Sequence, residues 1–172
     1  TRTEGPLTIS ITIFGESQKA LRRDQAQIGD DIWLSNTLGD ARLALAVLRN
    51  EIQLSENDQQ QVMPHLLTPQ ARVDLGLALN TIAHAAIDIS DGLIGDLGHI
   101  LKASHCGARI CADDIPMSNV LKQQTLATQY EFAFTGGDDY ELCFTAAQNQ
   151  RLAITELAKK LQLPLTRIGY IE

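Results

Sequence analysis

The chain has 172 residues, of which 44% are hydrophobic and 20% charged, and its formal net charge is −7. This length suits one domain with its own core, and the acidic balance disfavours a nucleic-acid partner because like charges repel. No apolar run approaches the ~18–20 residues that span a bilayer, and the N-terminus lacks the basic-then-apolar order of a signal peptide. We therefore expect a cytoplasmic protein. The chain opens on Thr1 rather than Met, which predicts a processed or cut N-terminus.

The three cysteines, Cys106, Cys111 and Cys143, form an odd set without a C-x-x-C pair. This pattern fits reduced thiols in the cytosol better than disulfides. Cys143 lies in the apolar segment Leu142–Phe144, where we expect it to act as a small buried hydrophobe. No catalytic or metal-binding role is predicted for a cysteine.

The first half of the chain mixes expected strands and helices. Leu7–Phe14 (LTISITIF) alternates and is rich in β-branched residues, which predicts a strand with an apolar edge. A second strand is expected at Asp31–Ser35 and an Ala/Leu-rich helix at Ala41–Leu48. The polar run Glu51–Gln61 predicts an exposed loop or a frayed helix. Pro69–Leu79 predicts a helix with proline in its first turn.

The second half continues the same mixture. Ala83–Ile89 is apolar and predicts a buried strand, and Leu93–Ser104 places leucines on one face of a helix. Further strands are expected at Gly107–Cys111, Glu131–Phe134, Leu142–Thr145 and Leu165–Ile171, and a helix at Gln148–Leu161. The mixture predicts an α/β or α+β domain in which helices pack on a mixed sheet.

Two carboxylates and a hydroxyl gather in the segment Ile87–Gly92 (IDISDG), where an expected strand gives way to a helix. Side chains two residues apart on a strand share a side, so Asp88 and Ser90 should point together. A turn at Asp91 can bring the second carboxylate towards them. Hard oxygen ligands of this kind suit Mg²⁺. The structural alternative makes Asp91 an ordinary helix N-cap and Ser90 a turn residue.

A second acidic segment is Phe134–Glu141 (FTGGDDYE), where two glycines precede Asp138 and Asp139. The glycines would allow a close approach of the backbone, and the acids could bind a cationic or hydroxylated group. The alternative is a hairpin-like turn with solvated acids.

The pair Arg22-Arg23 could clamp a phosphate through planar, bidentate hydrogen bonds. An exposed pair balanced by Asp24 is the alternative. Asp96 and His99 are spaced for a surface contact along one helix. The sequence contains no P-loop, no G-x-G-x-x-G motif and no Ser-His-Asp arrangement.

Taken together, these segments resemble the thiamine-monophosphate kinases, a family of the aminoimidazole-ribonucleotide-synthetase superfamily. Ala86–Ile110 (AIDISDGLIGDLGHILKASHCGARI) is similar to the family's aliphatic-Asp-x-Ser-Asp-Gly-Leu run. Thr135–Phe144 (TGGDDYELCF) is similar to its Gly-Gly-acid-Asp-Tyr-Glu-Leu run. A shorter likeness includes Thr3–Leu7, Ala20–Arg23 and Gly29-Asp30. The resemblance runs over nearly the whole chain and implies the superfamily's C-terminal α/β fold.

The resemblance implies transfer of the γ-phosphoryl group of ATP to thiamine monophosphate, giving thiamine diphosphate, with Mg²⁺ between the phosphates. It implies metal ligands at Asp88 and Asp91 and ATP contacts at Ser90 and Arg23. Asp138 matches a position where the family often has a Glu that contacts the thiamine substrate. No nucleophile or base is implied, because phosphoryl transfer depends mainly on alignment and charge neutralisation.

The resemblance also implies that an N-terminal domain, which supplies further metal ligands and forms a homodimer, is missing. Residues 1–28 would then be the tail of that domain or a connection from it, and residues 29–172 the C-terminal domain. We expect the isolated chain to be inactive. The alternatives are a non-catalytic domain that binds nucleotide or thiamine phosphate, and another ATP-dependent synthetase of the same superfamily.

Overall fold

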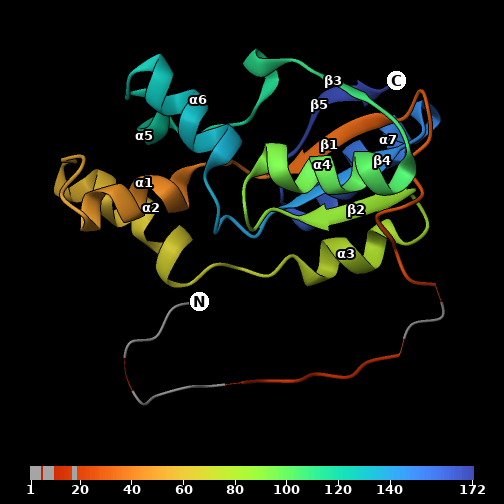
Figure 1. Cartoon of the computed structure of the whole chain (residues 1–172), viewed down its shortest axis with the longest axis horizontal. Helices are drawn as coiled ribbons and strands as arrows, with labels where there is room; N and C mark the ends of the chain where they lie inside the picture. The colour runs from red at the N-terminus through yellow and green to blue at the C-terminus, as the bar shows by residue number, and fades with distance from the viewer. Residues whose placement is uncertain (1–4, 6–9, 17–18) are drawn as a thin grey trace.

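An antiparallel sheet lies at the centre of the computed structural model, which describes residues 5, 10–16 and 19–172 (Figure 1). Its strands are ordered β2-β4-β1-β5-β3, and every neighbouring pair runs antiparallel. The strands are β1 Asp31–Ser35, β2 Ala85–Asp88, β3 Ala108–Ile110, β4 Leu142–Ala146 and β5 Leu165–Ile171. An isolated parallel bridge joins Arg22 to Ala85. The predicted fold class, an α/β domain with helices packed on a sheet, is confirmed, but the strands of the sheet are antiparallel rather than mixed.

The helices form two groups around this sheet. They are α1 Asp40–Leu48, α2 Glu56–Leu67, α3 Val73–Leu79, α4 Leu93–Ser104, α5 Asn119–Lys122, α6 Leu126–Thr135 and α7 Arg151–Leu161. Helices α1, α2, α5 and α6 gather beyond one end of the sheet, and α4 lies along β2 (Figure 1). Helices α3 and α7 contact each other and cover the other face. The bounds of α4 are those predicted from the sequence.

Side chains that alternate along β1 and β4 divide the core into two clusters. Ile32 and Leu34 pack with Cys143 in the cluster that includes α4. Trp33 and Phe144 point to the opposite face, where they stack with ring centroids 6.4 Å apart and pack on α3 and α7. Cys143 is buried as predicted, and its burial raises the pKa of the thiol to about 12. These strands read as apolar runs because both faces of the sheet are covered.

The predicted strand at Glu131–Phe134 is wrong, because these residues lie inside α6. The hydroxyl of Thr125 caps this helix by accepting a hydrogen bond from the Thr128 amide at 3.2 Å. Phe132 and Ala133 then face the core. Aromatic residues favour strands locally, but the cap and the helical spacing of the buried residues decide the outcome here.

The structure defines where two further helices begin. The run Glu51–Gln61, expected as an exposed loop or a frayed helix, is helical in its second half, which α2 occupies. Ser55 starts α2 by accepting a hydrogen bond from the Asp58 amide at 3.2 Å. The next helix begins at Val73, so Pro69 precedes it rather than occupying its first turn.

The predicted strand at Leu7–Phe14 is not found in its described part. The first three residues of this range lie outside the described residues, and residues 10–14 form no strand. Ile11, Ile13 and Phe14 are 78%, 86% and 90% exposed. Alternation is therefore not sufficient here, because a strand forms only where it finds a partner to bond with.

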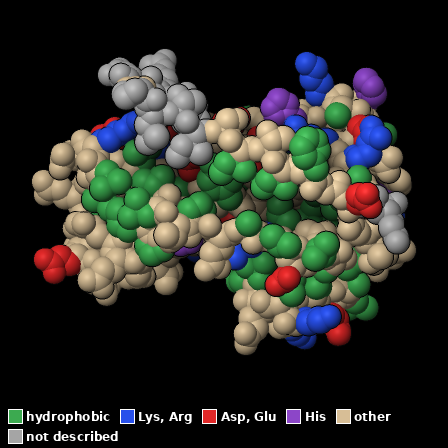
Figure 2. All heavy atoms as spheres, turned by 90° about the horizontal axis from the view of Figure 1, so that it is seen from below, with side chains coloured by type: hydrophobic (Ala, Val, Ile, Leu, Met, Phe, Trp, Pro, Cys, Tyr) green, Lys and Arg blue, Asp and Glu red, His purple; other side chains and the backbone are tan. Residues whose placement is uncertain are grey.

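A further apolar surface lies on the face seen from below in Figure 2. Helix α3 contributes Val73 and Leu77, which are 62% and 66% exposed, while its Leu75 and Leu79 are buried. Helix α3 is thus apolar on both sides. Within the described ranges, no helix is long and apolar enough to cross a bilayer.

Gly169 is needed where β5 passes close to β3. A Cβ at this position would lie 2.0 Å from the carbonyl oxygen of Arg109. We expect Gly169→Ala to lower the free energy of unfolding by ~2 kcal/mol or more, because the two strands must shift apart. A Cβ on Gly95, in α4, meets nothing within 4 Å. Gly95→Ala should therefore raise the free energy of unfolding by ~0.5–1 kcal/mol. Urea denaturation measures both changes, and equal stability of the two variants would contradict this packing.

Candidate functional site

The two acidic segments singled out in the sequence lie side by side. Strand β2 ends at Asp88 and its neighbour β4 begins at Leu142. Beyond these ends the backbones stay bonded: the Ile89 amide donates to the Glu141 carbonyl at 2.8 Å, and the Tyr140 amide donates to the Ile89 carbonyl at 2.8 Å. The β2–β4 pairing is thus extended into the segments that carry the acids.

Glycines permit the close contact between these segments. A Cβ on Gly137 would lie 2.4 Å from the Ser90 carbonyl oxygen, and one on Gly92 would lie 2.9 Å from the Thr135 backbone. Gly92 also has a φ of 107°, a conformation that other residues rarely adopt. The amide of Asp138 then donates to the Ser90 carbonyl at 2.9 Å. Gly-Gly in the second segment and Gly in the first are therefore complementary.

Three predicted site residues, Asp88, Asp91 and Asp138, lie near enough to Tyr140 for their charges to act on its phenol. Partial burial raises the pKa of Tyr140, and the negative charges of all three carboxylates raise it further. The Tyr140 hydroxyl donates a hydrogen bond to Asp138 at 3.3 Å. We call Asp88, Asp91, Asp138 and Tyr140 the acidic cluster. Its three carboxylates are exposed.

Backbone strain accompanies the acidic cluster. Asp138 and Tyr140 have φ values of 68° and 52°, in the left-handed region that costs a non-glycine residue ~1–2 kcal/mol. Such conformations persist only where the surrounding structure imposes them, and they are frequent at functional sites. The solvated-turn alternative accounts for the exposure and the left-handed backbone of Asp138, which aspartate tolerates in turns, but not for the left-handed backbone of Tyr140.

Asp96 holds the first acidic segment in place. Its carboxylate, 3% exposed, accepts hydrogen bonds from the amides of Ser90 at 2.9 Å and Asp91 at 3.0 Å. Gly92 occupies the N-cap of α4, so the alternative that Asp91 caps this helix is wrong. In the described chain, the carboxylates of Asp88 and Asp91 have no hydrogen-bond or ion-pair partner, which leaves their oxygens available to a ligand.

These two carboxylates fit Mg²⁺ in kind, because it prefers oxygen ligands and usually keeps water or phosphate in its remaining positions. They do not form a complete protein site. No group of three or more His, Cys, Asp or Glu side chains within the described ranges is arranged to hold a metal ion. The described residues therefore supply only part of a ligand set.

The two neighbouring arginines differ in their surroundings. Arg22 pairs with Asp24, its Nε lying 3.0 Å from the carboxylate, and this arginine lowers the pKa of Asp24. The balanced-pair alternative thus holds for Arg22. Arg23 lines a shallow pocket of about 330 Å³ together with Asp88. The structure brings these two predicted site residues to one pocket.

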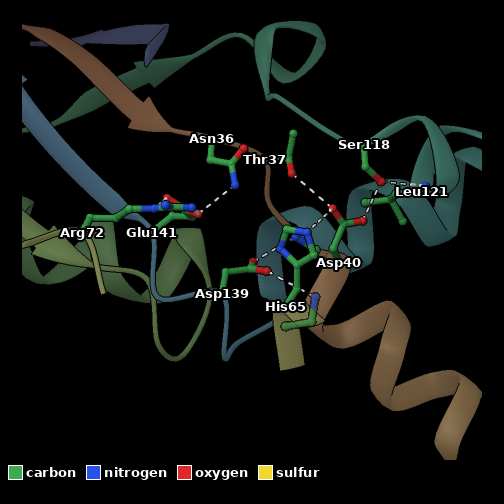
Figure 3. Close-up of polar contacts among 11 residues, drawn as sticks. Asn36, Thr37, Asp40, His65, Arg72, Ser118, Leu121, Asp139 and Glu141 are labelled. Carbon is green, nitrogen blue, oxygen red and sulfur yellow. Dashed lines mark hydrogen bonds and ion pairs between the residues drawn. The ribbon is translucent and has the colours of Figure 1, made fainter. Parts of the chain in front are cut away.

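A buried polar network lies next to the acidic cluster and was missed in the sequence (Figure 3). Glu141, 3% exposed, accepts hydrogen bonds from the Ser35 hydroxyl at 2.5 Å and the Asn36 amide at 3.0 Å. Arg72 donates to it twice, from Nε at 2.8 Å and from Nη2 at 2.5 Å. These bonds raise the pKa of Arg72. The only sequence signal was an acidic residue in the DDYE run.

Separate buried polar contacts nearby involve Asp139 and Asp40 (Figure 3). Burial raises the pKa of Asp139 to about 7, although bonds from the Gly39 amide at 2.9 Å and the Ala41 amide at 3.5 Å act in the opposite direction. Asp40, 1% exposed, accepts from the hydroxyl of Ser118 at 2.6 Å. A pocket of about 240 Å³ opens beside Asp139, and its lining includes Asn36, His65, Arg72 and Glu141.

The chain belongs to the family of the AIR synthase related protein, C-terminal domain, whose model matches residues 27–172. The thiamine-monophosphate kinase of Salmonella typhimurium is 44% identical over 171 residues, which cover 97% of this chain and 53% of that protein. The resemblance to this kinase family inferred from the motifs is thus confirmed. The chain spans about half the length of the curated relatives it matches.

Solved structures agree with this placement. The thiamine-monophosphate kinase from Stenotrophomonas maltophilia K279a is 49% identical and superposes with a TM-score of 0.85. The aligned region covers 90% of this chain and 51% of that one. AaThiL, in its structure complexed with AMPPCP and TMP, is 32% identical in sequence and superposes with a TM-score of 0.76. The aligned region covers 88% of this chain and 48% of that one. The fold is therefore that of the C-terminal half of these kinases.

The buried pair Arg72–Glu141 gives a stability prediction. We expect Arg72→Met to lower the free energy of unfolding by ~3–5 kcal/mol, because it leaves a buried carboxylate without its charged partner. Arg49, which is 59% exposed and lies 3.9 Å from Glu51, provides the matched control. Arg49→Met should change stability by less than ~1 kcal/mol. Thermal and urea unfolding measure both variants, and similar losses would show that the buried pair contributes no more than an exposed one.

Proposed function

We propose that this chain is the C-terminal half of a kinase that phosphorylates thiamine monophosphate with ATP and Mg²⁺, giving thiamine diphosphate. The observation that carries the proposal is the meeting of the two acidic segments, which brings Asp88, Asp91 and Asp138 near Tyr140. The sequence identity to thiamine-monophosphate kinases supports the same substrate class. The AMPPCP and TMP bound to AaThiL support a nucleotide and a thiamine phosphate as ligands.

Each residue of the acidic cluster has a proposed role. Asp88 and Asp91 hold Mg²⁺, since their carboxylates are exposed and lack partners among the described residues. When bound, Mg²⁺ neutralises charge on the reacting phosphates. Asp138 contacts the thiamine substrate, whose cationic ring suits an exposed carboxylate. Its side chain is one methylene shorter than the Glu that is frequent in this family.

ATP is proposed to contact Ser90 and Arg23. Ser90 lies between the two metal ligands, and its amide is fixed by Asp96. Arg23 is exposed and lines a pocket with Asp88, so its guanidinium is proposed to bind a phosphate of the nucleotide beside the metal. No residue is proposed as nucleophile or base, because transfer between two phosphates requires alignment and charge neutralisation.

The remaining proposals concern the whole protein. Residues 1–28 are proposed to connect to an N-terminal domain that supplies the other ligands and forms a homodimer, and residues 29–172 form the C-terminal domain. The family match from residue 27 supports this boundary. We propose a cytoplasmic location and no nucleic-acid or membrane partner. The chain alone would bind ligands weakly without turnover, because its described residues offer only part of a metal site.

A chimera tests the proposed function. The N-terminal half of the Stenotrophomonas maltophilia enzyme is fused to this chain, and thiamine diphosphate formation is measured with ATP and Mg²⁺. The wild-type chimera should be active. Asp88→Asn and Asp91→Asn should each lower kcat/KM by ~100-fold or more, because a metal-neutralised phosphate is worth several kcal/mol.

Asp114→Asn is the matched control, since Asp114 is exposed and lines a different pocket, which is formed largely by residues of β3 and β5. It should retain activity within about twofold. A folded, soluble chimera that produces no thiamine diphosphate would contradict the kinase proposal. Binding of thiamine monophosphate by that inactive chimera would favour the non-catalytic binding domain instead.

A further inference from the structure

The segment Gly136–Glu141, called loop 136–141 below, lies between two parts of the structure and is bonded to both. On one side, the amides of Asp138 and Tyr140 donate to the Ser90 and Ile89 carbonyls at 2.9 and 2.8 Å. On the other side, the carboxylate of Asp139 reaches the N-terminus of α1 (Figure 3). Alternate residues of the loop thus bond in opposite directions.

The N-terminus of α1 has no cap of its own. Gly39 is its N-cap residue, has a φ of 89°, and offers no side chain that could accept a hydrogen bond. A larger residue does not fit, because a Cβ there would lie 2.8 Å from Leu121 and 3.0 Å from the Ala133 amide nitrogen. Asp139 supplies the missing acceptor, with its Oδ2 2.9 Å from the Gly39 nitrogen.

We propose that Asp139 is a positioning residue: its buried carboxyl group fixes loop 136–141 to α1 and thereby aims Asp138 and Tyr140 towards Asp88 and Asp91. Both aimed residues have left-handed backbones, which do not persist without support from outside the loop. The Asp139 side chain, 6% exposed, provides that support on the side away from the acidic cluster. This role rests on the proposed function only for its effect on substrate.

The loop contact is also pH-dependent, with a defined sign. We call loop 136–141 closed when Asp139 is bonded to α1, and open when this contact is broken. In the closed loop, burial raises the pKa of Asp139 to about 7, and the nearby charges of Asp40 and Glu141 raise it further. An aspartate exposed to water has a pKa of about 4. The closed loop therefore holds a proton that an opened loop releases. Closure is strongest below about pH 4, weakens as the pH rises to about 7, and is constant above that.

Other charged groups surround Asp139 and must be separated from it. Arg72 neutralises Glu141 through two hydrogen bonds. His65 of α2 lines the same pocket, and its Nε2 lies 3.9 Å from Asp40. Because histidines change charge between about pH 5 and 8, the pH experiments are repeated in a His65→Gln background.

Hydrogen exchange of the 172-residue chain, followed by NMR, tests the positioning role without any ligand. The readouts are the amides of Gly39 and Tyr140, corrected for intrinsic exchange. Asp139→Asn retains an acceptor but carries no charge. Relative to this variant, wild-type protection should fall about 50- to 100-fold between pH 5 and pH 7.5. Asp139→Ala should lose protection of both amides at either pH.

Asp138→Asn is the matched control, because it removes the neighbouring exposed carboxylate and should keep the wild-type pH dependence. The proposal is overturned if wild type and Asp139→Asn share one pH dependence. It is also overturned if Asp139→Ala frees the Gly39 amide and leaves the Tyr140 amide protected. In that case Asp139 would cap α1 without holding the loop.

The chimera extends the test to substrate. Asp139→Ala should raise KM for thiamine monophosphate by ~10-fold, because the residues proposed to contact this substrate lose their alignment. Asp139→Asn should keep a low KM. The ratio of the wild-type KM to the Asp139→Asn KM should rise between pH 5 and 7.5. This ratio is used because the ligand's own titration affects both KM values equally and cancels. An unchanged KM in an active Asp139→Ala chimera would overturn the proposal. An inactive wild-type chimera would count against the proposed kinase function, and hydrogen exchange would then decide the role of Asp139.

Discussion

The backbone pairing between β2 and β4 is the constraint on which the candidate site depends. This pairing does not stop where the strands end, because Ile89 and Tyr140 remain bonded beyond them. The contact requires a residue without a side chain at Gly137, since a Cβ would reach within 2.4 Å of the Ser90 carbonyl. Residues about fifty positions apart are thereby brought into one cluster. The proposed metal, nucleotide and substrate roles of these residues depend on the contact between the two segments.

Carboxylates in this region fall into two physical classes. Glu141, Asp139 and Asp96 are buried and accept hydrogen bonds from several donors, so they act on the structure. Asp88 and Asp91 are exposed and have no partner in the described chain, so their charge is available to a cation. Burying a carboxylate without donors is costly, and crowding free ones on a surface is tolerated only with solvent or a counter-ion. The buried carboxylates fix the backbone segments that carry the exposed carboxylates.

The sequence was informative where local rules were sufficient. Strand β2 and helix α4 follow from apolar pattern and turn chemistry, and so does the grouping of Asp88 with Asp91. It was uninformative where partners are distant, as in the pair Arg72–Glu141, which lies 69 residues apart in the chain. No spacing rule connects such residues, because the sheet brings them together. The strand predicted at Glu131–Phe134 failed for a related reason, since the packing of α6 outweighed aromatic β-propensity.

The position of β2 at the edge of the sheet completes the argument for a shared site. An edge strand presents unpaired backbone groups, and here the Ala86 amide donates to the Arg22 carbonyl at 3.1 Å. This single bridge fastens the chain that precedes β1 to the strand that ends in Asp88. Arg23 is thereby placed in the same pocket as Asp88, although it lies outside the sheet. Arg23 and Asp88 line one pocket but form no ion pair with each other. Their opposite charges suit a ligand that contains both a phosphate, which an arginine binds, and a metal ion, which a carboxylate binds.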